Sequence, residues 1–80
     1  MKANRAYELT VGRGSRGPAL FARAGTLDHV EIVEIASGEV VLFWDTAASQ
    51  TGRLARALRA DLAQLEEHEF LARWRRYETR

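Results

Sequence analysis

The sequence predicts a small α+β domain, in which an antiparallel meander sheet of four strands is followed by a C-terminal helix, or two helices, packed on one face. Residues 29–36 (HVEIVEIA) and 39–45 (EVVLFWD) are rich in β-branched and aromatic side chains, as strands are. Only Ser37-Gly38 separates them, and such a connection is typical of a β-hairpin. Residues 54–65 then carry leucines at helical spacing.

A two-residue turn would determine which residues of the hairpin face each other. The predicted pairs are Ala36 with Glu39, Ile35 with Val40, Val33 with Leu42 and Glu31 with Trp44. Since paired residues share a face, one face would carry Val33, Ile35, Val40, Leu42 and Trp44, and the other Val30, Ile32, Val41 and Phe43. Both faces are then largely apolar, and strands of this kind are usually covered on both sides.

Two more strands are expected before the hairpin. Residues 6–11 (AYELTV) alternate apolar and polar side chains, which is the pattern of a strand with one buried face. After a turn-forming loop at residues 12–18 (GRGSRGP), residues 19–24 (ALFARA) predict a weaker strand.

The rest of the chain predicts helix, beginning among residues 45–51, where several side chains, Asp45 among them, offer N-cap oxygens. One apolar stripe is formed by Leu54, Leu58, Leu62 and Leu65. On a continuous helix, a second apolar set would lie about 100° away from this stripe. That second set is Phe70, Trp74 and Tyr77. Either the helix breaks at residues 66–69, which we favour, or it continues and presents a second face to a different partner.

Composition limits the possible classes of protein. The 80 residues form one domain, residues 1–80, near the lower size limit for a self-sufficient core. There is no cysteine, which excludes disulfides, thiolate metal sites and cysteine nucleophiles. No apolar run is long enough to span a bilayer, and the first residues lack the apolar core of a signal peptide. We therefore expect a cytoplasmic protein with no membrane partner.

Two motifs superficially match ligand sites. Residues 12–17 (GRGSRG) fit the G-x-G-x-x-G pattern of dinucleotide-binding loops, but Pro18 and a strand-like run follow where a helix would be required. His68 lies in an acidic run, but no second His or Asp has the spacing that would complete a set of metal ligands on one helix face. Neither a cofactor nor a metal ion is expected.

No catalytic constellation is predicted either. Asp45 follows a core strand and has Ser49 and Thr51 nearby, but no spacing brings His29 or His68 to them. We therefore expect a protein without enzymatic activity.

The function that the pattern favours is a non-enzymatic protein-interaction or regulatory module that works as a homodimer or with another protein. One amphipathic helix can cover only one face of a sheet that is apolar on both faces, so a second covering surface is required. The candidate residues for self-association are Val41, Phe43, Phe70, Trp74 and Tyr77.

The alternative is a nucleic-acid-binding accessory protein that uses an arginine ridge on the C-terminal helices. Arginines beside aromatic side chains can combine phosphate contacts with base stacking. The candidate contacts are Arg13, Arg16, Arg53, Arg56, Arg59, Arg73 and Arg76. Acidic residues are interleaved with them, and the net charge is only +1, which favours the interaction module.

Overall fold

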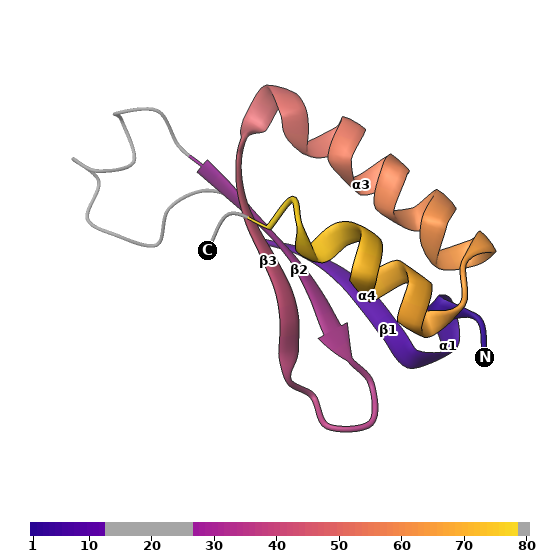
Figure 1. Ribbon diagram of the computed structural model, residues 1–80. Coiled ribbons are helices and arrows are strands. Elements are labelled where there is room, and N and C mark those ends of the chain that lie inside the picture. Colours follow the sequence, from indigo (N-terminus) through magenta and orange to yellow (C-terminus); the bar gives the residue numbers. More distant parts are fainter. Residues whose placement is uncertain (13–26, 79–80) are drawn as a thin grey trace.

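The computed structural model describes residues 1–12 and 27–78 (Figure 1). The elements in this part of the chain are α1 (Ala3–Ala6), β1 (Tyr7–Gly12), β2 (Leu27–Glu34), β3 (Val40–Ala47), α3 (Ala48–Gln64) and α4 (Glu67–Arg75). The described strands form a three-stranded antiparallel meander, β1-β2-β3, with α3 and α4 packed against it. The α+β class is confirmed, and the strand predicted at residues 19–24 lies outside the described residues.

Alternation along the strands gives the sheet a covered inner face and an opposite outer face. The inner face carries Tyr7, Leu9, Val11, Val30, Ile32, Leu42 and Trp44. Its central residues are fully buried, because both α3 and α4 pack on this side of the sheet (Figure 1). The outer face carries Leu27, His29, Glu31, Val33, Phe43 and Asp45, with Glu8 and Thr10 of β1 beside them.

The leucine stripe of α3 is confirmed as the helix surface that contacts the sheet. Leu58 and Leu62 are buried in the core, and Leu54 and Leu65 are half-buried against it. The helix begins at Ala48, within the expected range of residues 45–51, but its cap differs from expectation. Its N-cap is Ala47, and no side chain caps the free amides, so Asp45 is not a helix cap.

The expected break between two C-terminal helices is also confirmed. Leu65 is extended, with φ −92° and ψ 156°, and α4 begins at Glu67. Glu66 and Glu69 form a reciprocal capping box at the start of α4. Local capping therefore starts a new helix at this point, without Gly or Pro.

The predicted two-residue turn of the hairpin is wrong. The backbone N–H of Glu34 donates to the carbonyl of Glu39 at 2.8 Å, so residues 35–38 form a longer loop. The N–H of Gly38 donates to the carbonyl of Glu34 at 2.7 Å, and Gly38 has a φ of 75°, which glycine adopts without steric cost. Ile35, predicted to lie on a face that would be covered, is 53% exposed.

The predicted register is wrong as a consequence. β3 pairs Val40 with Val33 but Leu42 with Ile32, so Val41 is an extra residue that forms a bulge. The longer loop and the bulge together shift the pairing, and such a shift exchanges the faces of a strand. The observed pairing sends Ile32 to the covered face together with Leu42, and leaves Val33 on the outer face.

Candidate functional site

The residues predicted for self-association do not form one surface. Phe70 has no exposed area, and its ring stacks on Tyr7 with centroids 6.0 Å apart. Trp74 is half-buried and packs against the same core. Both residues belong to the chain's own core, which corrects the prediction for Phe70. The hydrophobic face of α4 folds back onto the inner face of the sheet, next to α3.

The other members of that set lie apart from each other. Phe43 is half-buried on the outer face of the sheet, whereas Tyr77 follows α4 and is 60% exposed. Val41, the bulged residue, is half-buried and touches the core. Because the sheet separates Phe43 from Trp74, a single contact cannot bury both residues, as the predicted dimer required.

The arginines divide into paired and unpaired groups. On α4, Arg73 forms an ion pair with Asp61 at 3.1 Å. Arg53, Arg56 and Arg59 are exposed on α3 and have no ion pair or side-chain hydrogen bond with another described residue. Arg76 is exposed just after α4. The predicted contacts Arg13 and Arg16 lie outside the described residues.

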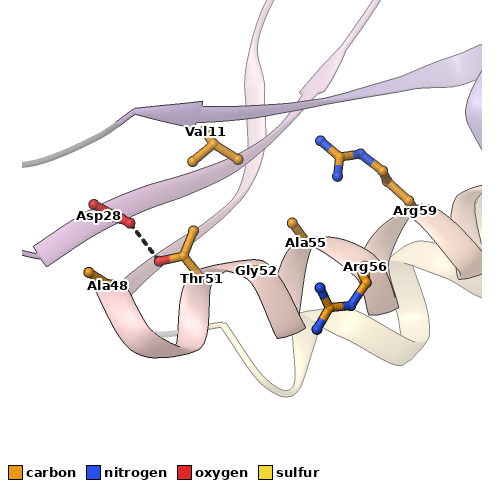
Figure 2. Close-up of a pocket in the computed structure, with 8 residues that line it drawn as sticks. All are labelled: Val11, Asp28, Ala48, Thr51, Gly52, Ala55, Arg56 and Arg59. Atoms are coloured by element: carbon orange, nitrogen blue, oxygen red, sulfur yellow. Dashed lines mark hydrogen bonds between the residues drawn. The ribbon is translucent and has the colours of Figure 1, made fainter.

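A hollow of about 440 Å³, the α3 pocket, opens between the first half of α3 and the adjoining ends of β1 and β2 (Figure 2). Its lining consists of Val11, Asp28, Ala48, Thr51, Gly52, Ala55, Arg56 and Arg59. Four of the α3 residues that line the hollow, Ala48, Thr51, Gly52 and Ala55, are small, so the helix leaves space beside the sheet. This pocket was not predicted, because it depends on how α3 lies across β1 and β2.

A buried polar network forms one wall of the α3 pocket. The hydroxyl of Thr51 donates to Oδ2 of Asp28 at 2.7 Å, and the Thr46 and Thr51 hydroxyls are 2.7 Å apart. Asp28 is only 5% exposed and Thr51 only 6%. Hydrogen bonds to a buried carboxylate offset its desolvation. The network therefore ties the first turns of α3 to β2 and holds this wall in place.

The two arginines of the pocket lie at its exposed side. Figure 2 shows Arg59 extending from α3 toward β1. Arg56 lies along the helix near Gly52, where an added Cβ atom would be 3.8 Å from Nη1 of Arg56. The pocket thus combines two cationic side chains, a buried carboxylate network and a surface of small apolar residues.

A second polar pair lies on the outer face of the sheet. Nδ1 of His29 is 2.8 Å from Oδ1 of Asp45, and the His29 ring is tilted against Phe43 with centroids 5.5 Å apart. The sequence pattern did not bring His29 to Asp45, because the predicted register does not place them opposite each other. The observed register pairs them directly. Thr51 does not join them, because it binds Asp28 on the other side.

Within residues 1–12 and 27–78, no group of three or more His, Asp or Glu side chains is placed to hold a metal ion. None of the helices described is both long enough and apolar enough to cross a bilayer. Comparisons with protein-family models, curated proteins and solved structures found no match to the chain. Function is therefore inferred from the geometry of the α3 pocket and of the outer face.

Proposed function

We propose that the chain is a non-enzymatic protein-interaction domain that forms a homodimer through the outer face of its sheet. The observation that carries the proposal is that α3 and α4 both pack on the inner face. No described helix covers the outer face. There, Leu27 is 45% exposed, and Val33 and Phe43 are half-exposed.

The distribution of residues on the outer face supports an interface. Val33 and Phe43 provide apolar area on neighbouring strands, and polar residues lie beside them. Those polar residues are Glu8, His29, Glu31 and Asp45. An apolar centre with a polar rim is the common composition of protein interfaces.

A second copy of the chain is the partner that this face fits best. A two-fold dimer places the same patch of both copies in contact, and such dimers are the commonest oligomers. A small domain also gains stability from the added burial, because its own core is limited by its size. A specific interface should bury more than about 1,000 Å² in total.

Sedimentation equilibrium at tens of micromolar tests this proposal. We expect a dimer mass for the wild type and a monomer mass for Phe43→Ser, with an unchanged circular dichroism spectrum. Tyr77→Ser is the matched control, because it removes an exposed aromatic residue outside the outer face. A wild-type monomer would reject the dimer. Loss of the dimer in Tyr77→Ser alone would reject the outer face as the interface.

A second candidate function is nucleic-acid binding through Arg53, Arg56 and Arg59. The observation that favours it is that these exposed side chains have no ionic partner among the described residues. Fluorescence anisotropy with a labelled oligonucleotide at low salt tests it. We expect binding that weakens steeply as salt rises and is lost in the double variant Arg56→Glu, Arg59→Glu. Absence of binding by the wild type would reject this function.

A further inference from the structure

The α3 pocket has the size of a small-molecule site. Its volume of about 440 Å³ falls in the range of about 300–1,000 Å³ that is usual for ligand pockets. The α3 wall is formed by Ala48, Gly52 and Ala55, and Val11 faces it from β1. These residues offer a shallow apolar surface on which the body of a ligand can lie.

The charges at the pocket indicate which ligand it would take. Arg56 and Arg59 lie at its exposed side without an ionic partner among the described residues. Asp61, the acidic residue of α3, is engaged elsewhere, because it pairs with Arg73 and accepts a hydrogen bond from Trp74. Two guanidinium groups that no carboxylate of the described residues pairs with favour an anionic group, which they can bind with paired hydrogen bonds.

The opposite wall of the pocket restricts where that anionic group can lie. Asp28 and Thr51 at that wall are only 5% and 6% exposed and are hydrogen-bonded to each other, so they offer little surface to an anion. The anionic group is therefore expected at the arginines, with the rest of the ligand directed toward the Asp28–Thr51 wall.

We propose that the α3 pocket binds a small organic anion, whose phosphate or carboxylate group is held by Arg56 and Arg59 and whose body lies on the small residues of α3. This site is separate from the proposed dimer interface, because α3 lies on the inner side of the sheet. Ligand binding and dimerisation can therefore be tested independently.

Titration of the ¹⁵N-labelled full chain, followed by amide chemical shifts, tests the site. The probes are phenyl phosphate and benzoate, which distinguish the two anionic groups, and benzyl alcohol as the uncharged control. We expect saturable shifts at the amides of Val11, Gly52 and Ala55 with at least one of the anions, and none with benzyl alcohol. The anion that binds more tightly identifies the ligand class.

Three variants locate the interaction. Arg59→Gln should weaken binding about tenfold or more, the loss expected for a charge-assisted hydrogen bond. Arg53→Gln removes an arginine of the same helix that does not line the pocket, and should change affinity less than about twofold. Gly52→Leu should abolish binding by filling the pocket, whereas Ala60→Leu, on an exposed position of α3, should not.

Four results would overturn the proposal. These are absence of localised shifts with both anions, equal shifts with benzyl alcohol, an equal loss in Arg53→Gln and Arg59→Gln, and saturable binding of an oligonucleotide without binding of either anion. The last result would assign the arginines to nucleic acid. Circular dichroism of each variant confirms that the chain is folded. Since Arg53 and Arg59 are both exposed, their substitution leaves the core unchanged.

Discussion

Trp44 and Trp74 meet edge to face, with ring centroids 6.0 Å apart and ring planes at 88°. Nε1 of Trp44 donates to the carbonyl of Tyr77 at 2.8 Å, and Nε1 of Trp74 donates to Oδ2 of Asp61 at 2.9 Å. Both indoles therefore contribute apolar area and also have their polar atom satisfied. Together they link β3, α3 and the C-terminal residues, and so they help to hold α4 in place.

The acceptor of the Trp74 indole should be important for stability. Asp61→Ala removes the partner of a partly buried N–H and of Arg73, and we expect a loss of about 1–3 kcal/mol in the free energy of unfolding. Asp61→Asn keeps an oxygen acceptor and should lose clearly less. Urea denaturation measures both variants. Equal losses would show that the hydrogen bond from Trp74 is not the stabilising contact.

The centre of the leucine stripe should tolerate truncation poorly. Leu58 has no exposed area, so Leu58→Ala should destabilise the chain by about 2–5 kcal/mol through lost burial and the cavity that remains. Leu54→Ala is the matched control, because Leu54 is only half-buried and should cost less. Denaturant melting compares the two. A loss below about half a kcal/mol for Leu58→Ala would contradict the observed packing of α3.

The hairpin loop should require glycine at one position. Gly38 has a φ of 75°, so Gly38→Ala should cost about 1–2 kcal/mol in stability, and Gly38→Val at least as much. Gly52→Ala provides a control of opposite sign, because Gly52 lies inside α3, where alanine should stabilise by about 0.5–1 kcal/mol. Ser37→Ala, on the loop surface, should have a small effect. Thermal melting of the variants checks the order, and equal effects of Gly38→Ala and Ser37→Ala would contradict it.

The N-terminal ammonium and Glu66 should make stability depend on pH at both ends of the range. Their atoms are 2.7 Å apart, and their hydrogen bond raises the pKa of the amine above 8.0 and lowers the pKa of Glu66 below 4.5. The contribution of Glu66 is complete above its unfolded pKa and is lost as pH falls through the lowered value. The contribution of the amine is complete below its unfolded pKa and is lost as pH rises through the raised value.

Melting temperatures measured across pH test this linkage. We expect the contribution of the pair to be greatest between about pH 4.5 and 8.0 and to decline on both sides. Glu66→Gln keeps an oxygen acceptor for the start of α4 but removes the charge, so it should flatten both declines relative to the wild type. Identical pH profiles of the wild type and Glu66→Gln would rule out this ion pair as their cause. Both groups are exposed, so added salt should reduce the difference.

The sequence predicted the features that local periodicity controls. The alternation of residues 6–11 identified β1, and the leucine spacing identified the buried side of α3. The change in apolar pattern after Leu65 identified two helices instead of one. Each of these features depends on residues close together in the chain. There, a period of two residues indicates a strand, and a period of about 3.6 residues indicates a helix.

The sequence predicted less of the candidate sites than of the fold. Arg56 and Arg59 were identified as anion contacts, but the pocket they line requires β1 and β2 beside α3. The pairing of His29 with Asp45 required a register that the turn residues did not reveal. Phe70 was predicted to lie in an interface, but it is buried in the chain's own core. The apolar pattern does not show whether the surface that buries such a residue belongs to the same chain.

By itself, the sequence determined that this chain has a hairpin with a glycine-dependent loop, followed by two amphipathic helices. Only the tertiary structure decided which face of the hairpin is buried, since a bulge at Val41 shifts the pairing and both faces carry apolar residues. It also decided that both helices cover the same face, because Phe70 and Trp74 find partners in Tyr7 and Trp44. The hydrophobic effect favours burial of these apolar residues, but contacts between residues far apart in the sequence decide which surface buries them.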